Sequence, residues 1–399
     1  MSVRTLFRGG HLFDGESLGL ADVVVEGDRI VDVGPGLDAD SSVDCAGKTI
    51  LPGLFDTHVH LVLSHINVWQ ILQTPFSYRY YEAMHNMAAT VRAGITTVRD
   101  AGGADLGMKE AVENGLIVGP RMHIALSMLS QTGGHGDGWL PSGASADFLP
   151  SYPGMPSTIV DGAEEMRKKV RELVRAGADV IKVATSGGVL SPRDEPTHAH
   201  FSLEELEMLV AEASAAGLWV MAHAQATDGI KNAIRAGIRS IDHGIYLDDE
   251  AIGMMLERGT FLVPTLVAPR GVTKAVEAGA QIPEASIRKA EEVVEAHRDS
   301  FRRAVQAGVK IAMGTDSGVT PHGDNLEELT LMVEGGMTPL AALTATTRTA
   351  AELMGMADQL GTVEAGKVAD LVVVGGDPFE FDTLGRRVEQ VWMAGSQVI

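Results

Sequence analysis

The 399-residue sequence predicts a mixed α/β protein, a (β/α)8 TIM barrel with a small β-sandwich domain built from both termini. The first observation is a glycine that recurs after helix-like segments and before short apolar runs. Glycine suits the left-handed position that ends a helix, and the runs have the length of buried parallel strands. These helix-to-strand joins are "RAG" at 92–94, 175–177 and 235–237, "AAG" at 215–217, "ERG" at 257–259 and "QAG" at 306–308.

The second observation is the number of apolar runs. Helical stretches such as "SLEELEMLVAEASAAG" and "ASIRKAEEVVEAHRDSFRRAVQAG" separate them. Eight alternating units over about 260 residues are typical of a (β/α)8 barrel, and a doubly wound open sheet is the alternative. In chain order the runs are "ILPGLFDTHVH", "ITTVRDAGG", "RMHIALS", "ADVIKVATS", "LWVMAHAQ", "IRSIDHGIYL", "TFLVPTL" and "VKIAMGTDS".

The two ends of the chain depart from this alternation. Residues 1–54 and 360–399 contain short strand-like patches separated by Gly and Asp turns. We therefore expect one discontinuous β-sandwich domain from both ends and a barrel from residues 55–359.

Composition excludes several classes of protein. The formal charge of −21 opposes binding to nucleic acid or to an anionic membrane. The single cysteine, Cys45, excludes an internal disulfide and a thiolate metal cluster. The N-terminus lacks the pattern of a signal peptide, and no apolar run approaches the ~20 residues of a membrane helix. We expect a cytoplasmic enzyme with a small-molecule substrate. The sequence leaves open whether the chain forms a homo-oligomer.

Four histidines and an aspartate fall at the C-terminal ends of predicted strands, where barrel enzymes keep their active sites. His58 and His60 lie two apart in "DTHVH", so their imidazoles share one face. "AHAQ" contains His223, "IDHG" contains His243 and "GTDSG" contains Asp316. Together they predict a metal site.

Lys182 lies within the apolar strand "DVIKVATSGG" at the same level of the barrel. A free ammonium there would repel the metal ions that the histidines imply. The position makes sense if the amine has reacted with carbon dioxide to form an anionic carbamate that bridges two metals. The alternative is an ion pair with a neighbouring carboxylate such as Asp100.

This order of ligands resembles the amidohydrolase superfamily in its binuclear, carboxylated-lysine form, and the resemblance covers the whole chain. It implies that His58, His60 and Asp316 hold one metal, that His223 and His243 hold the other, and that Lys182 bridges them. It also implies a shared hydroxide as nucleophile, with Asp316 as the proton shuttle. Zinc is the first choice of metal, and manganese, iron and cobalt stay open.

Two segments narrow the resemblance. "SQTGGHGD" and "TPHGDN" are similar to the branch of Xaa-Pro dipeptidases, Xaa-Arg carboxypeptidases and ochratoxin amidohydrolases. The resemblance implies that His135 contacts the scissile carbonyl and stabilises the oxyanion. The alternative is that His135 packs the glycine-rich loop.

Substrate contacts are expected from loops near the strand ends. Gln225 stands where this branch often has a tyrosine, which changes the contact from a phenol to an amide. Arg193 could bind a substrate carboxylate, or it could be a solvated loop charge. The segment 139–160 has the composition of a covering loop, with candidate contacts at Trp139, Phe148 and Tyr152, or these residues pack the loop itself.

The sequence therefore predicts a metal-dependent hydrolase that cleaves the amide bond of an N-acyl amino acid or dipeptide with a free carboxylate. A first alternative keeps the metal centre and changes the substrate to an aryl amide, urea, carbamate or lactone. A second alternative, from another class, is a non-catalytic metal-binding scaffold.

Overall fold

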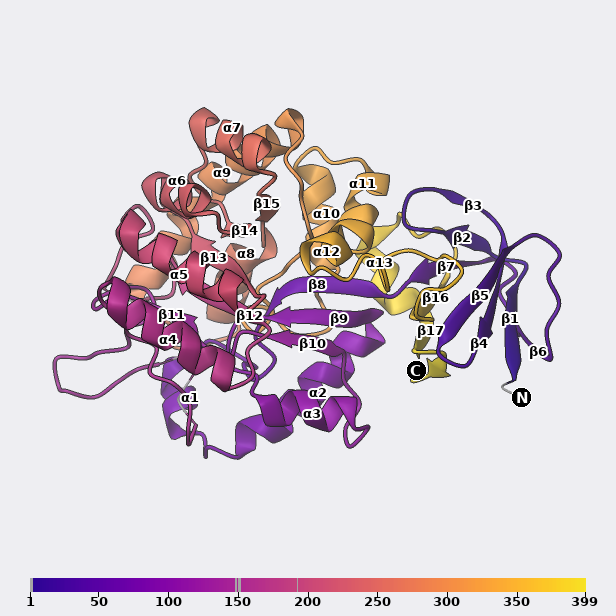
Figure 1. The fold of residues 1–399 in the computed structure, drawn as a ribbon, viewed down its shortest axis with the longest axis horizontal. Helices are drawn as coiled ribbons and strands as arrows, with labels where there is room; N and C mark the ends of the chain where they lie inside the picture. The colour runs from indigo at the N-terminus through magenta and orange to yellow at the C-terminus, as the bar shows by residue number, and fades with distance from the viewer. Residues whose placement is uncertain (1–2, 148, 150–151, 192) are drawn as a thin grey trace.

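The computed structural model describes residues 3–147, 149, 152–191 and 193–399, and it shows a mixed α/β part beside a part made of strands (Figure 1). The first part contains two sheets in which every hydrogen-bonded neighbour is parallel. One sheet has the order β10-β9-β8 and the other the order β11-β12-β13-β14-β15. Their strands are β8 (Leu54–Val59), β9 (Ile95–Asp100), β10 (Arg121–Ile124), β11 (Met128–Leu129), β12 (Val180–Ala184), β13 (Trp219–Ala224), β14 (Ser240–His243) and β15 (Phe261–Val263).

The predicted third and eighth runs differ from regular strands. Only the first four residues of the third run form a strand, β10; β11 begins just after the run, and Leu126 between the two strands has a φ of 65°. The eighth run is assigned no strand, but isolated parallel bridges join its Ile311 to Leu262 and its Ser317 to Val59. Asp316 has a φ of 60°, which turns the backbone out of the extended conformation and interrupts a ladder there. The run therefore lies between β15 and β8 without a continuous ladder.

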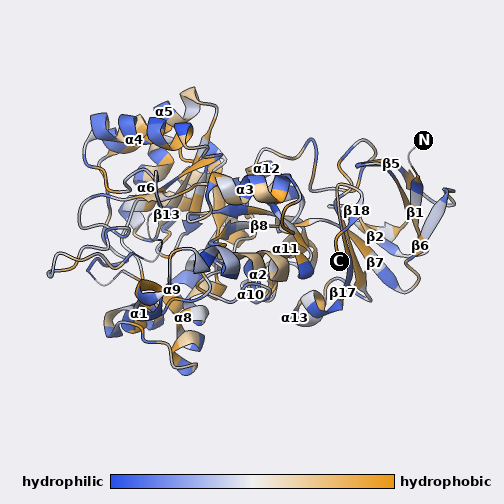
Figure 2. Ribbon diagram, turned by 90° about the horizontal axis from the view of Figure 1, so that it is seen from below, coloured by the Kyte–Doolittle hydropathy of each residue, from blue (hydrophilic) through white to orange (hydrophobic). Residues whose placement is uncertain are grey.

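Helices follow the strands and carry their hydrophilic faces outward (Figures 1 and 2). The six join glycines all have a positive φ, as predicted, between 67° and 95°. The helices are α1 (Val68–Gln73), α2 (Tyr78–Arg92), α3 (Leu106–Glu113), α4 (Ala163–Arg175), α5 (Leu203–Ala215), α6 (Thr227–Ala236), α7 (Asp249–Arg258), α8 (Val267–Glu277), α9 (Glu284–Ala307), α10 (Glu327–Glu334), α11 (Pro339–Ala345), α12 (Arg348–Leu353) and α13 (Phe381–Leu384).

Strands from both ends of the chain form the second part, and both termini lie there (Figure 1). A six-stranded sheet has the order β18-β17-β16-β7-β2-β3, and β16 pairs antiparallel with β7. A four-stranded sheet has the order β5-β4-β1-β6, and a buried apolar cluster contains side chains from both sheets. The strands are β1 (Arg4–Arg8), β2 (His11–Phe13), β3 (Leu18–Leu20), β4 (Asp22–Glu26), β5 (Arg29–Gly34), β6 (Ser41–Asp44), β7 (Lys48–Pro52), β16 (Leu371–Gly375), β17 (Val388–Met393) and β18 (Ser396–Gln397).

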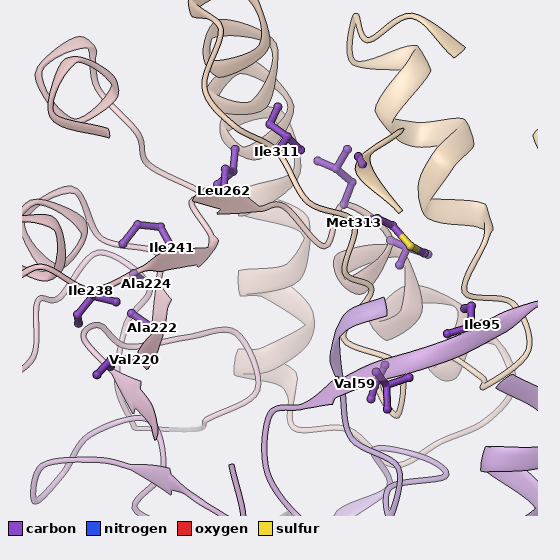
Figure 3. Packing of buried hydrophobic residues seen from close by; sticks show 14 of the residues in the cluster. Val59, Ile95, Val220, Ala222, Ala224, Ile238, Ile241, Leu262, Ile311 and Met313 are labelled. Carbon is purple, nitrogen blue, oxygen red and sulfur yellow. The ribbon is translucent and has the colours of Figure 1, made fainter. Parts of the chain in front are cut away.

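The main core lies between the parallel strands and the helices that cover them. Figure 3 shows part of it, where Val59, Ile241 and Leu262 are almost fully buried. Burial of this apolar surface fixes the strands, so polar side chains at their C-terminal ends are held by a rigid frame. None of the described helices is both long enough and apolar enough to cross a membrane.

Candidate metal centre

All six predicted ligands line one cavity of about 490 Å³. His58, Lys182, His223 and His243 are supplied by four different parallel strands, and His60 follows directly after β8. The remaining ligands are His60 and Asp316, which are half-buried, whereas the four strand residues are buried. Parallel strands end at the same edge of the fold, which explains why residues far apart in sequence meet here.

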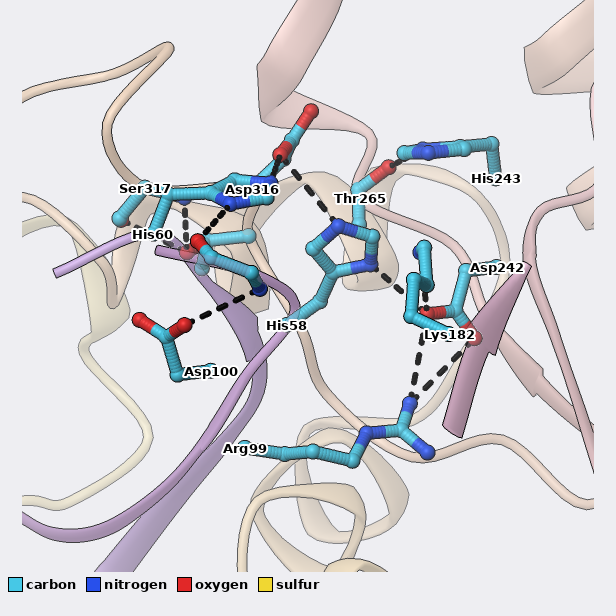
Figure 4. Close-up of polar contacts among 12 residues, drawn as sticks. His58, His60, Arg99, Asp100, Lys182, Asp242, His243, Thr265, Asp316 and Ser317 are labelled. Carbon is cyan, nitrogen blue, oxygen red and sulfur yellow. Dashed lines mark hydrogen bonds and ion pairs between the residues drawn. The ribbon is translucent and has the colours of Figure 1, made fainter. Parts of the chain in front are cut away.

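His58, His60 and Asp316 form a group in which one ligand atom from each lies within 4.8 Å of the others. The Nε2 atoms of His58 and His60 are 3.4 and 3.2 Å from Asp316 Oδ1 (Figure 4). Two imidazole nitrogens that converge on a carboxylate are a donor set that suits a divalent ion such as zinc. This group could therefore hold a metal.

The outward-facing nitrogens of the histidines are held by oxygen atoms. His58 Nδ1 lies 2.8 Å from Asp242 Oδ2, and His60 Nδ1 lies 2.8 Å from the carbonyl oxygen of Gly102. His243 Nδ1 lies 2.7 Å from Thr265 Oγ1. An acceptor at Nδ1 places the hydrogen there and leaves the Nε2 lone pair free for a metal, which is the usual arrangement of metal-binding histidines.

Lys182 is paired with Asp242 rather than with Asp100. Its Nζ lies 3.4 Å from Asp242 Oδ2. Asp100 instead accepts backbone N–H groups from Gly102 and Ala104 of its own loop, at 3.0 and 3.1 Å, and from Leu61 after β8, at 2.8 Å. Burial lowers the pKa of Lys182, which favours the neutral amine, the form that can attack the carbon of carbon dioxide.

Asp242 and Arg99 are polar residues of the centre that the sequence analysis did not single out. Arg99 Nη2 lies 3.3 Å from Asp242 Oδ1 (Figure 4). Burial would raise the pKa of Asp242, but the charges of Lys182 and Arg99 outweigh it and hold that pKa well below its usual range. The signal was available, because a carboxylate in the apolar run "RSIDHG" needs a partner as much as Lys182 does.

Three residues of the centre have a left-handed backbone. The φ angles are 74° at His243, 51° at Thr265 and 60° at Asp316. Such conformations cost of order 1–3 kcal/mol each and collect at functional sites. The surrounding structure therefore holds these side chains against a local backbone preference.

His135 and Gln225 also line the cavity. The His135 ring stacks on that of His223, with centroids 4.1 Å apart and planes inclined by 17°. The Gln225 side chain is buried, and its Oε1 atom has no hydrogen-bond partner among the described residues. Both side chains are therefore placed where a substrate could meet them.

The other predicted contacts lie elsewhere. Trp139 and Arg193 are exposed and outside the set of cavity-lining residues, and the Arg193 guanidinium sits 5.1 Å from the centroid of the Trp139 ring. Tyr152 lines a separate small pocket with Tyr80. Phe148 lies outside the described residues, so the structure says nothing about it.

Comparisons with known proteins agree with this geometry. The model of the amidohydrolase family matches residues 49–398. The chain belongs to the amidohydrolase family. Ochratoxinase of Aspergillus niger is 34% identical over 409 residues, which cover 96% of this chain and 83% of that protein.

Solved structures support the same branch. A Xaa-Pro dipeptidase with methionine in its active site has a TM-score of 0.90 and 34% identity, with 99% of each chain covered. A prolidase complexed with N-methylphosphonate-L-proline has a TM-score of 0.91 and 37% identity, with 99% of each chain covered. The family and these neighbours imply a TIM barrel with an additional domain. The protein is a hydrolase that acts on amide bonds, so the non-catalytic scaffold is set aside.

Proposed function

We propose that this amidohydrolase cleaves the amide bond of an N-acyl amino acid or dipeptide with two divalent metal ions, with zinc as the first choice. The observation that carries the metal centre is the convergence of His58, His60, Lys182, His223, His243 and Asp316 on one cavity. His58, His60 and Asp316 would hold one ion, and His223 and His243 would hold the other. Lys182, as its carbamate, would supply oxygen ligands to both.

The metal-ligand geometry described above supports the assignment. Nδ1 of His58, His60 and His243 is engaged by an oxygen atom, so Nε2 remains available. His223 uses the opposite nitrogen, because its Nε2 lies 3.1 Å from the carbonyl oxygen of Gly187. Bound divalent ions would supply a hydroxide nucleophile at neutral pH and would polarise the scissile carbonyl.

The side chains have separate tasks in the reaction. The Asp316 carboxylate accepts a proton as the tetrahedral centre forms and returns it to the leaving nitrogen. His135 faces the carbonyl oxygen and donates a hydrogen bond to the developing negative charge. His135 stacks on His223, so the ring is fixed beside the metal centre rather than free in its loop.

A second candidate substrate class keeps this chemistry but lacks the carboxylate. The described cavity-lining residues include no arginine, and Lys182 is their one lysine, whereas Asp137 and Asp147 are both present. Such a lining gives little attraction to a free carboxylate. Together with the neutral Gln225, this lining is the observation that supports an aryl amide, urea, carbamate or lactone as the second candidate.

We also propose the architecture in which the site is held. Backbone hydrogen bonds run from Leu262 N to Lys310 O and from Thr57 N to Met313 O. These contacts support a closed (β/α)8 barrel over residues 55–359, in which residues 309–317 take the place of the eighth strand. The terminal sheets support a β-sandwich domain of residues 1–54 and 360–399. A cytoplasmic location and a homo-oligomer remain predictions.

The test combines elemental analysis with a paired substrate screen. Protein purified without chelator is expected to contain about two metal ions per chain. Each N-acyl amino acid is assayed beside its carboxamide, so the two members differ in the carboxylate alone. Faster hydrolysis of the acids supports the leading class, and faster hydrolysis of the carboxamides and aryl amides supports the second. Absence of metal after reconstitution would refute the metal centre.

A further inference from the structure

The loop that follows β12 packs against the His135 ring through residues 188–194. An ideal Cβ on Gly188 would lie 2.3 to 2.7 Å from three atoms of that ring, so only glycine lets the ring lie flat against this backbone. Ser191 Oγ is 2.7 Å from His135 Nδ1. Asp194 Oδ2 is 3.5 Å from the same nitrogen. The loop therefore contacts both the face of the ring and its outward nitrogen.

The hydrogen positions in this cluster follow from its acceptors. Ser191 Oγ donates to Asp194 Oδ1 in a short hydrogen bond. Since the hydroxyl hydrogen is used there, Ser191 Oγ accepts a hydrogen from His135 Nδ1. His135 Nε2 has no partner among the described residues. Nε2 is therefore the ring nitrogen that stays free for a substrate in the cavity that His135 lines.

Lys289 holds the loop in place from α9. Its Nζ donates to the carbonyl oxygens of Gly188, Ser191 and Asp194 at 2.7, 2.5 and 2.9 Å. The side chain is 1% exposed, although α9 is rich in charged residues. The hydrogen-bonding groups of this buried ammonium are paired with three carbonyl oxygens, and a carboxylate lies nearby. Lys289 therefore stabilises the conformation of the loop that contacts His135.

We propose that Ser191 and Asp194 are positioning residues for His135, which fix its Nδ1 and direct its Nε2 toward the scissile carbonyl. The inference rests on the proposed role of His135. Because Nδ1 donates its hydrogen to Ser191 Oγ, donation from Nε2 to an oxyanion requires the ring to carry a hydrogen on that nitrogen as well. A histidine oriented by a carboxylate is a recurring device of hydrolases.

The test is a double-mutant cycle between His135→Ala and Asp194→Asn. Asp194→Asn is expected to lower kcat about 10- to 100-fold, the usual cost of losing a group that orients a site residue. KM and metal content are expected to change little. In the His135→Ala background the same substitution is expected to change kcat less than about twofold, because it acts through the ring.

Ser191→Ala gives the same cycle without a change of charge, should Asp194→Asn fold poorly. Glu195→Gln is the matched control, since Glu195 is the next residue and pairs with exposed Arg288 of α9 at 3.1 Å, away from His135. This control is expected to leave kcat unchanged.

Each other outcome has a distinct meaning. An equal loss of kcat from Asp194→Asn in both backgrounds would show a general structural role and overturn the inference. An unchanged kcat in both the Asp194 and Ser191 variants, beside a slow His135→Ala enzyme, would overturn it as well. Full activity of His135→Ala would instead refute the role proposed for His135 itself, and the inference would fall with it.

Discussion

Lys182 and Asp242 place a cation and an anion 3.4 Å apart inside the apolar strands, and Arg99 adds a second cation to the same carboxylate. A buried ion pair of this kind is costly to break from one side, because the remaining charge loses its partner. Conversion of the lysine to a carbamate would change its charge from positive to negative. Asp242 would then be balanced by Arg99 and by the metal ion proposed to bind at His58.

Lys182→Ala is expected to remove the bridge, to lower metal content well below that of the natural protein and to abolish hydrolysis. Added acetate or propionate is expected to restore part of the activity, because a short carboxylate can occupy the space and supply the bridging oxygens. Elemental analysis and a hydrolysis assay measure the two effects. Lys310→Ala, at an exposed lysine paired with Glu352, is the control, and full activity of Lys182→Ala would refute the bridge.

Gln225→Leu is expected to raise the free energy of unfolding and to lower the rate of substrate hydrolysis. The buried Oε1 atom has no partner, and such an atom costs about 1–3 kcal/mol that leucine of similar size would recover. If a substrate group bonds to Gln225 Oε1, the substitution lowers kcat/KM while it raises the free energy of unfolding. Urea unfolding and steady-state kinetics test this, and an unaltered kcat/KM would remove Gln225 from substrate binding.

At the scale of elements, the helix ends determine where each strand begins. Gly237, Gly259 and Gly308 cap α6, α7 and α9 in the left-handed conformation. A side chain in that conformation costs roughly 1–2 kcal/mol for most residues. The join glycines therefore stabilise the succession of helix and strand on which the alignment of strand ends depends.

Gly308→Ala and Gly253→Ala form a pair with opposite expected signs. Neither glycine has a neighbouring atom within 4 Å of an added Cβ, so packing does not decide the result. Gly308 has a φ of 84°, and its replacement is expected to lower the free energy of unfolding by about 1 kcal/mol. Gly253 lies inside α7, where replacement by alanine is expected to raise the free energy of unfolding by about 0.5–1 kcal/mol. Urea unfolding of both variants measures the difference, and equal signs would contradict the backbone argument.

At the scale of the whole molecule, the site joins segments that are far apart in the chain. The candidate ligands extend from His58 to Asp316, and the pairing of β16 with β7 ties the C-terminal end to the N-terminal end. Two ions held by these ligands would together link β8, β12, β13 and β14 to residues 309–317. Metal binding is therefore coupled to the stability of the entire fold.

Removal of metal by a chelator is expected to lower the melting temperature by roughly 3–5 °C, on the basis of about 2.7 kcal/mol of stabilisation at a hundredfold excess over Kd. Added zinc is expected to reverse the shift. Thermal unfolding with and without chelator measures it, and Lys182→Ala should show a smaller change because it binds less metal. A melting temperature that chelation leaves unaltered, in protein shown to lose its metal, would contradict this coupling.

The sequence by itself determined the succession of helices and strands, because apolar periodicity and join glycines are local signals. The six join glycines adopt the positive φ that their position predicts. The sequence also placed Lys182, His223 and His243 in three strands that prove to be neighbours, and His58 in a strand of the other parallel sheet. These features follow from short stretches of chain and from simple rules of parallel sheets.

Only the tertiary structure decided which groups meet. The partner of Lys182 is Asp242, 60 positions along the chain, rather than Asp100, whose carboxylate is used by its own loop. The Arg193 guanidinium lies on the Trp139 ring, and neither residue lines the cavity. Lys289 is buried although it belongs to a helix rich in charged residues. Loop paths and the direction of long side chains depend on packing between distant segments, and no local pattern encodes them.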